Sequence, residues 1–189
     1  MDTKKVALAE VEMIRKMLTQ ISQEEASKVV DEIQKANRVF VGGAGRSLLS
    51  MKTFAMRLMQ VKHETYLVGE VCTPSVQPGD LIIVASGKGR TQVTLDMVNK
   101  AKSHGARAVV LTQTPGAPVP EAADCVLVIP KTPAVEEEDS EELAFAKANL
   151  PGNFPETLII LILDGIIAEL MNREGKDGSV INFMHANLE

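Results

Sequence analysis

Residues 79–112 read GDLIIVASGKGRTQVTLDMVNKAKSHGARAVVLT, and they contain a strand, a loop, a helix and a second strand. The two apolar runs, 79–86 and 106–112, are typical of strands buried on both faces of a sheet. Between them, 91–105 has helical character and ends at Gly105, a residue type that often follows a helix C-terminus. A helix between two such strands predicts a parallel pair joined by a crossover, which is the repeating unit of α/β folds.

Strand-like and helix-like segments alternate along the rest of the chain in the same way. This alternation predicts a parallel sheet covered by helices on both faces. Ser22 and Glu25 form a Ser-x-x-Glu capping box, in which each side chain is expected to bond a free backbone N–H of the other's turn. The further strands are expected at 38–43, 64–69 and 123–130, and the further helices at 4–19, from Ser22 onward, at 47–61 and at 155–173.

The composition fits one folded domain in a reducing compartment. The chain has 189 residues, 45% of them hydrophobic, so we expect a single domain over 1–189 whose core needs neither metal nor disulfide. Cys72 and Cys125 form no CxxC or zinc-binding pattern, and we interpret them as reduced thiols of a cytoplasmic protein. The N-terminal segment carries scattered charges and no continuous apolar stretch, so no signal peptide is expected.

Charge and hydropathy argue against two classes of partner. The net charge is −5, whereas binding to a nucleic-acid backbone requires a basic surface. With one Tyr and no Trp, the chain also has few rings on which bases would stack. The longest apolar stretch, at 157–171, contains Asp164 and Glu169 and is too short and too charged to span a bilayer. We therefore expect neither a nucleic-acid partner nor a membrane.

Two glycine-rich loops each follow a predicted strand and precede a predicted helix. They read GGAGRS at 42–47 and SGKGRT at 86–91. Ligands of doubly wound sheets bind beyond the carboxyl ends of strands, and tight glycine turns at helix N-termini favour phosphate. Hydroxyls at Ser47, Ser86 and Thr91 add donors. Neither loop has the P-loop or dinucleotide spacing, so a small phosphorylated molecule is favoured over a nucleotide, although either loop alone is also compatible with a plain turn.

The segment 131–153 is long for a simple connection, and long loops in compact domains often form lids or the walls of sites. Within it, EEEDSEE at 136–142 concentrates like charges. Such charges repel one another and stay solvated, so we interpret this stretch as a surface loop.

Two titratable residues near the end of the chain have both a structural and a functional interpretation. Glu156 follows Pro155 at the start of the last long helix, where an acid stabilises the positive helix end and proline suits the first helical position. A lone histidine near a terminus, such as His185, is more often a surface residue than a catalyst. His63 and His104 lie at predicted helix ends and receive no role. No metal-binding cluster is present in the sequence, so neither metal nor cofactor is expected.

Taken together, these motifs resemble the sugar isomerase (SIS) domain family, and within it the 6-phospho-3-hexuloisomerases. The matching segments span essentially the whole chain, and their combination is specific where each alone is weak. They are GAGRS at 43–47, TFAMRLM at 53–59, VGE at 68–70, PGDLIIVASG at 78–87 and HANLE at 185–189.

The resemblance implies a five-stranded parallel sheet in a three-layer α/β/α sandwich of the flavodoxin-like, doubly wound type. We divide the chain into N-terminal helices at 1–36, a core at 37–173 and a C-terminal tail at 174–189 that contributes to the site. The implied activity is an aldose–ketose-type isomerisation, without cofactor, of D-arabino-3-hexulose 6-phosphate to fructose 6-phosphate through an enediol(ate). That reaction belongs to the ribulose monophosphate route of formaldehyde fixation.

The resemblance also assigns the site residue by residue. Glu156 matches the family's glutamate at the start of the last helix and would remove the proton from carbon. His185 matches the histidine of the terminal motif and would move protons between the oxygens, from a tail that serves a neighbouring subunit's site. The sugar phosphate is expected at the two loops, on Gly45, Arg46, Ser47, Ser86, Lys88, Gly89 and Thr91.

The second loop departs from the family's usual Ser-x-Ser-Gly-Glu-Thr. Lys88 stands in place of the second serine and Arg90 in place of the glutamate. Lys88 either takes over a phosphate contact through a charge-assisted hydrogen bond or fills the space that the phosphate needs. The segment NLPGNFPE at 149–156 also differs from the family's Pro-Met-Gly-Ser-Leu-Phe-Glu, because Pro155 precedes the glutamate.

Two other functions therefore stay open beside isomerisation of a 3-hexulose 6-phosphate. One is a regulatory module that binds sugar phosphates with weak or no catalysis. The other is an isomerase of a pentose 5-phosphate or a heptose 7-phosphate. We also expect a homo-oligomer, a dimer or a tetramer, because the N-terminal helices and the Met-rich segment 51–59 offer more apolar surface than one small sheet covers.

Overall fold

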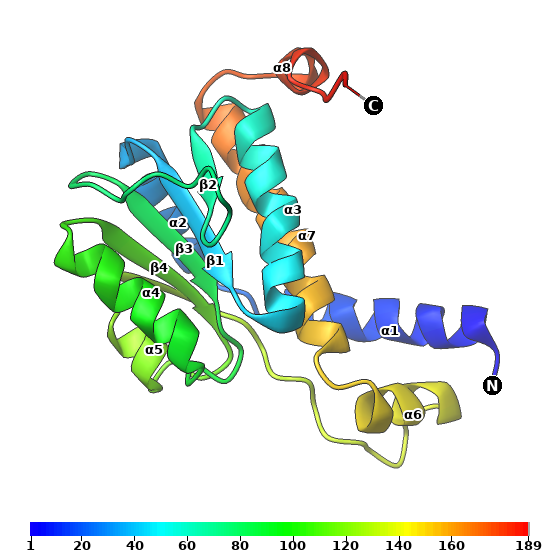
Figure 1. The fold of residues 1–189 in the computed structure, drawn as a ribbon. Helices are drawn as coiled ribbons and strands as arrows, with labels where there is room; N and C mark the ends of the chain where they lie inside the picture. The colour runs from blue at the N-terminus through cyan, green and yellow to red at the C-terminus, as the bar shows by residue number, and fades with distance from the viewer. Residues whose placement is uncertain (189) are drawn as a thin grey trace.

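The computed structural model describes residues 1–188 and is built on a five-stranded, wholly parallel sheet with the strand order β2-β1-β3-β4-β5 (Figure 1). The predicted parallel sheet and all five predicted strands are confirmed. The sequence order of the strands reverses between β1 and β3, which is where open α/β sheets bind ligands. The strands are β1 (Val39–Gly43), β2 (Thr65–Leu67), β3 (Leu81–Ala85), β4 (Arg107–Thr112) and β5 (Cys125–Val128).

Helices cover both faces of this sheet, so the molecule is the expected three-layer α/β/α sandwich (Figure 1). On one face lie α2 (Gln23–Lys35), α3 (Gly45–Gln60) and α7 (Asn153–Arg173), and α1 (Thr3–Leu18) packs against α7. On the other face lie α4 (Gln92–Ser103) and the short α5 (Pro118–Glu121). Two further helices, α6 (Glu141–Asn149) and α8 (Gly178–Phe183), lie outside these layers, α6 beside α1 and α8 at the C-terminal end of α7 (Figure 1).

The two faces of the sheet carry separate apolar cores because successive strand residues point to opposite sides. Val39, Val41 and Ile83 pack under α2, α3 and α7, while Phe40 and Ile82 pack under α4. The first core is the larger, and α7 is its central helix, in contact with α1, α2 and α3. The face beneath α4 is covered by fewer elements, and part of it stays open near β2.

The strand register brings the two glycine-rich loops to one edge of the sheet. Gly43 of β1 pairs with Ala85 of β3, and Ala85 pairs with Leu111 of β4. The loops that follow β1 and β3 therefore start side by side, at the switch point, and lead into α3 and α4.

Three local expectations differ from the structure. Only half of the capping box forms: Ser22 Oγ accepts from the Glu25 N–H at 3.2 Å, but the Glu25 carboxylate accepts from the Val128 N–H at 2.8 Å and so ties α2 to β5. The last long helix begins at Asn153, two residues early. The interpretation of 136–142 as a plain surface loop is wrong in part, because α6 begins at its end. The tail contains α8, and Glu189 of the predicted segment 174–189 lies outside the described residues.

Candidate functional site

A polar cavity of about 600 Å³ lies at the C-terminal edge of the sheet, where the two glycine-rich loops meet the start of α7. Four residues predicted from the sequence line it together: Ser47, Lys88, Thr91 and Glu156. They come from three separate segments of the chain. The rest of the lining is formed by Gly87, Gln113, Thr114, Lys131, Thr132, Lys147, Leu150, Pro151, Gly152, Phe154 and Pro155.

Three side chains at the start of α3 tie it to the start of α7. Arg46 donates from Nη2 to Asn153 Oδ1 at 3.1 Å, so this predicted phosphate ligand is engaged with the neighbouring helix. Ser47 Oγ donates to Glu156 Oε1 at 3.1 Å, and Ser50 Oγ donates to the main-chain oxygen of Glu156 at 3.1 Å. The position of Glu156 is thereby fixed at both its backbone and its carboxylate.

The carboxylate of Glu156 lies against the backbone of Gly152. Within residues 1–188, its Oε2 is buried and has no hydrogen-bond partner. Gly152 precedes α7 with a φ of +82°, and a Cβ at this position would lie 2.9 Å from Oε2. Only glycine suits both the backbone conformation and the space. Pro155 is harmless as the third residue of α7, because the first four N–H groups of a helix have no intrahelical acceptor.

The second loop is held by β4 and the segment that follows it. Ser86, 4% exposed, accepts at its main-chain oxygen from Thr112 Oγ1 at 2.8 Å and from the Gly89 N–H at 2.9 Å. Gly89 has a φ of +64°, and a Cβ there would lie 2.6 Å from the Cβ of Ala117. The Ser86 hydroxyl lies 3.5 Å from Thr91 Oγ1. The loop is therefore a rigid turn whose two hydroxyls lie close together.

The two unexpected cations of this loop occupy different environments. Both side chains are exposed, but Lys88 lines the cavity and Arg90 does not. Within the described chain, 1–188, neither side chain forms an ion pair. Lys88 thus brings a positive charge, without an ion-pair partner among residues 1–188, to the cavity that contains the hydroxyls of Ser47 and Thr91.

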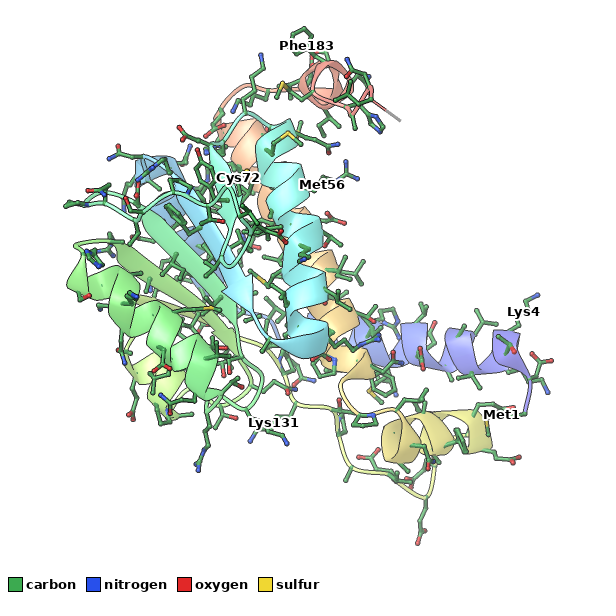
Figure 2. All side chains as sticks on the ribbon, viewed as in Figure 1. Met1, Lys4, Met56, Cys72, Lys131 and Phe183 are labelled. Atoms are coloured by element: carbon green, nitrogen blue, oxygen red, sulfur yellow. The ribbon has the colours of Figure 1, made fainter. Side chains whose placement is uncertain are left out.

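The sequence pattern did not single out the polar residues that follow β4 and β5 in the cavity, although the expected wall 131–153 begins with two of them. Gln113 and Thr114 follow β4, and Lys131 and Thr132 follow β5 shortly after its last residue. Figure 2 shows Lys131 at this edge of the molecule. Since the carboxyl ends of parallel strands share one edge, polar residues directly after these two strands were the available signal.

A buried ion pair organises the remaining wall. The Lys147 ammonium donates to Asp139 at 2.7 Å and to the Ala134 main-chain oxygen at 3.0 Å. The side chains of Lys147 and Asp139 are 1% and 7% exposed. The hydrogen bond from Lys147 and one from the Glu136 N–H lower the pKa of Asp139 below its ordinary value. The predicted wall 131–153 is thus a folded element, and its helix α6 packs on α1.

His185 is remote from this cavity within one chain. It lies after α8, exposed, with Nδ1 3.2 Å from the Ala186 main-chain oxygen. Glu156 lies near the start of α7 and α8 beyond its end, so the helix alone separates them by roughly 25 Å at about 1.5 Å per residue (Figure 1). Figure 2 likewise shows Phe183 and Lys131 at opposite ends of the molecule.

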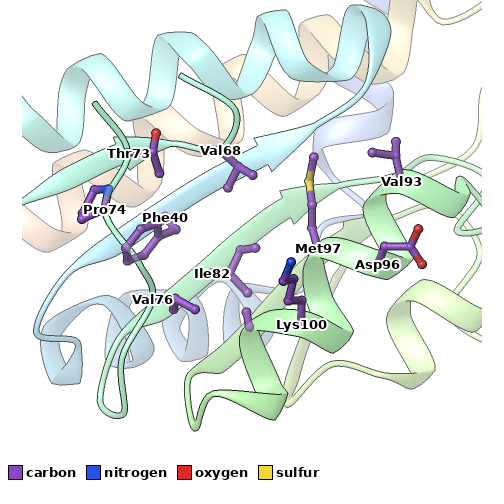
Figure 3. Close-up of a pocket in the computed structure, with 11 residues that line it drawn as sticks. Phe40, Val68, Thr73, Pro74, Val76, Ile82, Val93, Asp96, Met97 and Lys100 are labelled. Atoms are coloured by element: carbon purple, nitrogen blue, oxygen red, sulfur yellow. The ribbon is translucent and has the colours of Figure 1, made fainter. Parts of the chain in front are cut away.

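A second pocket, of about 300 Å³, lies on the face of the sheet beneath α4 (Figure 3). Its lining is mainly apolar, from Phe40 and Ile82 on the sheet to Met97 on α4, with Asp96 and Lys100 as its charged members. No residue of either glycine-rich loop lines it. The chemistry expected of the site therefore belongs to the polar cavity.

The residues that the structure describes contain neither a metal-binding cluster nor a membrane-spanning helix. Among residues 1–188, three or more His, Cys, Asp or Glu side chains do not gather in a way that would hold a metal ion. In that same part of the chain, every helix is too short or too polar to cross a membrane.

Comparison with known proteins places this chain in a family. A family model described as SIS domain matches residues 32–151. The 3-hexulose-6-phosphate isomerase of Methylomonas aminofaciens is 40% identical over 164 residues, which cover 86% of each chain. The 3-hexulose-6-phosphate isomerase of Bacillus subtilis (strain 168) is 36% identical over 169 residues, which cover 89% of each chain.

A solved structure is similar to this chain along nearly its whole length. A protein of Methanococcus jannaschii superimposes with a TM-score of 0.70 and 32% sequence identity, over 97% of both chains. Its crystal structure was described as inferring a molecular function of 3-hexulose-6-phosphate isomerase.

Proposed function

The chain belongs to the SIS-domain family, and we propose that it is a sugar-phosphate isomerase that interconverts D-arabino-3-hexulose 6-phosphate and fructose 6-phosphate. The relatives named 3-hexulose-6-phosphate isomerase match this chain over most of their own length. The observation that carries the proposal is the position of Glu156. Its carboxylate lies in the same cavity as Ser47, Lys88 and Thr91, so one small molecule would reach an acid–base group and a set of phosphate donors together.

The phosphate binds, in this proposal, between the two glycine-rich loops. Backbone N–H groups at the start of α3 and α4 point to this edge and favour an anion. Lys88 supplies the positive charge that binds the phosphate. We favour this role over obstruction of the site because the Lys88 side chain lines the cavity and has no ion-pair partner among residues 1–188. The proposed phosphate ligands are Gly45, Arg46, Ser47, Ser86, Lys88, Gly89 and Thr91.

The reaction moves the carbonyl group from C3 to C2. Glu156 removes the proton from C2 of the 3-hexulose, and the electrons of that C–H bond form the C2–C3 double bond of an enediol(ate). A proton moves from the oxygen on C2 to the oxygen on C3, and Glu156 returns its proton to C3. Atoms and electrons balance without any cofactor. Donors around the oxygens stabilise the charge that develops there.

His185 is the proposed carrier of the oxygen proton, and it would reach the cavity from another copy of the chain. The separation of His185 from Glu156 along α7 supports this sharing of the site between subunits. A neutral imidazole both accepts and donates a proton near pH 7, as the step between the two oxygens requires.

We propose a homotetramer or dimer in the cytoplasm, acting in the ribulose monophosphate route. Exposed apolar side chains on the outer faces of α1 and α3 support the assembly, among them Leu8 at 56%, Leu49 at 63% and Met56 at 46% exposure. Cys72 and Cys125 are both free thiols, which suits a reducing compartment.

A coupled assay tests the proposed activity. The 3-hexulose phosphate is generated in situ, and fructose 6-phosphate is followed through glucose 6-phosphate. Wild type should turn over, and Glu156→Gln should lose activity by a factor of about 10² or more, since removing a positioned base costs that much. Equal rates for wild type and Glu156→Gln would refute the assignment. A panel of pentose 5-phosphates and heptose 7-phosphates shows whether another sugar is preferred.

A further inference from the structure

The hydroxyl of Ser47 serves two demands in the same cavity. It donates to Glu156 Oε1 at 3.1 Å, and it belongs to the loop that the proposed function assigns to the phosphate. A serine hydroxyl has one proton and donates one hydrogen bond at a time. It therefore cannot donate to the carboxylate and to a phosphate oxygen together.

We propose that Ser47 couples phosphate binding to the strength of Glu156 as a base. In the free enzyme the hydroxyl donates to the carboxylate. When the phosphate enters, the hydroxyl turns to a phosphate oxygen, and the carboxylate is left to hold a proton more tightly. The inference rests on the proposed function, because it takes Glu156 as the base and the two loops as the phosphate site.

The surroundings of Glu156 make this exchange consequential. Among residues 1–188, Ser47 is the donor to Oε1, and Oε2 is buried without a partner. Gly152 closes off Oε2, leaving too little space there for even a Cβ atom. Loss of the Ser47 hydrogen bond would thus remove the side-chain donor that stabilises the charged carboxylate. A hydrogen bond to the charged form of an acid favours that form, and its removal favours the protonated form.

The helix geometry explains how Ser47 faces both groups. Ser47 is the third residue of α3. Ala44, which precedes the helix, has no side chain that could cap the free N–H groups. The Ser47 N–H is one of the free donors at the helix start, next to the Ser47 hydroxyl. Ser50, one turn later, also donates to Glu156, but to the main-chain oxygen, at 3.1 Å. Ser50 anchors the helix without bonding the carboxylate, and it provides a matched control.

The exchange predicts an enzyme whose base is strongest once the substrate's phosphate is bound. A carboxylate that holds a proton more tightly removes one from carbon more readily. The coupling moves no proton between groups, since only the acceptor of one hydrogen bond changes. A sugar without phosphate would bind next to a weaker base and react slowly, even at saturation.

The test measures protonation of Glu156 directly, with inorganic phosphate as the probe. Protein labelled with ¹³C at the glutamate carboxyl groups is titrated by NMR, and the Glu156 signal is assigned by its absence in Glu156→Gln. In wild type, saturating phosphate should raise the proton affinity of Glu156 about tenfold, the size expected for loss of one hydrogen bond to a charged group. Ser47→Ala should show this raised affinity without phosphate, and Ser50→Ala should titrate like wild type.

Two outcomes overturn the coupling. One is a wild-type titration that phosphate leaves unchanged. The other is a phosphate-free Ser47→Ala protein that titrates like wild type, which would mean that the hydroxyl does not control the carboxylate. Simple repulsion between phosphate and carboxylate would also raise the proton affinity of Glu156 in wild type. It would not, however, make phosphate-free Ser47→Ala differ from phosphate-free wild type.

A kinetic readout separates this inference from the proposed function. For Ser47→Ala, the acid limb of kcat/KM, which reports the free enzyme, should move to higher pH by about one pH unit. The acid limb of kcat, which reports the substrate complex, should stay in place because the hydroxyl has already left the carboxylate there. If turnover depends on Glu156 but neither acid limb moves in Ser47→Ala, the proposed function stands and the coupling is rejected.

Discussion

Replacement of Gly152 by alanine tests the proposed position of the base. The added Cβ would lie 2.9 Å from Glu156 Oε2, closer than carbon and oxygen atoms that are not bonded approach. The carboxylate must then move by several tenths of an ångström from the position in which it accepts the Ser47 hydrogen bond. A misplacement of about 1 Å costs a catalytic group up to roughly 10²-fold, so kcat of Gly152→Ala should fall about tenfold to a hundredfold.

The same substitution also strains the backbone, and a second glycine separates the two effects. Gly152 has a φ of +82°, where an L-residue other than glycine loses about 1–2 kcal/mol. Gly69 has a φ of +97°, and a Cβ there would meet no atom within 4 Å. Gly152→Ala and Gly69→Ala should therefore both lower Tm by roughly 2–8 °C. Only Gly152→Ala should lower kcat.

The assay is the coupled turnover measurement, with Tm followed by calorimetry on the same preparations. Equal kcat for the two alanine variants at equal loss of Tm would refute the argument that Gly152 makes room for the carboxylate. A loss of kcat in Gly69→Ala as large as that in Gly152→Ala would refute it too, because general destabilisation would then explain both.

Further predictions concern the cavity wall, its lysine and the sharing of the site. Lys147→Met should lower the free energy of unfolding by about 2 kcal/mol in urea denaturation, since it leaves the buried Asp139 carboxylate without its charged donor; an unchanged midpoint would contradict this. The pKa of Asp139 is lowered in the folded state. The ion pair of Asp139 with Lys147 therefore stabilises the protein fully at pH values above the ordinary aspartate pKa of about 3.9, and this stabilisation is lost as the pH falls through the lowered pKa of the folded state. Asp139→Asn should accordingly lose stability at pH 7 but lose less than wild type on acidification. Lys88→Ser should raise KM about tenfold if its ammonium binds the phosphate, whereas a lower KM would mean that Lys88 obstructs the site. Mixed oligomers of Glu156→Gln with His185→Asn should regain activity that neither variant has alone; no recovery would argue against a site shared between subunits.

The fold was accessible from the sequence because its signals are local. The apolar runs at 79–86 and 106–112 hold β3 and β4, and Gly105 ends α4 with a φ of +83° as expected. The short helices α5, α6 and α8 were not predicted, and the reason is clearest for α6. The α6 sequence is acidic at the start, and the interaction that organises it joins Lys147 to Asp139, an acid that a pattern of like charges had suggested was solvated.

The candidate site was accessible only in part, for a different reason. Ser47, Thr91 and Glu156 follow from loop chemistry and from family resemblance, and they line one cavity. The hydrogen bond between Ser47 and Glu156 joins residues 109 positions apart, and no spacing rule predicts such a contact. The same holds for the Glu25 carboxylate, which a local rule assigned to its own helix and which bonds the Val128 N–H.

The central step of the proposed reaction is the exchange of a proton between Glu156 and a sugar carbon. Fructose 6-phosphate incubated with the enzyme in D₂O tests this by NMR, without any coupling enzyme. Reversal through the 2,3-enediol removes the C3 proton, so wild type should lose the C3–H signal and Glu156→Gln should retain it. Exchange at C1 in place of C3, or equal C3 exchange in wild type and Glu156→Gln, would contradict the proposed reaction and its base.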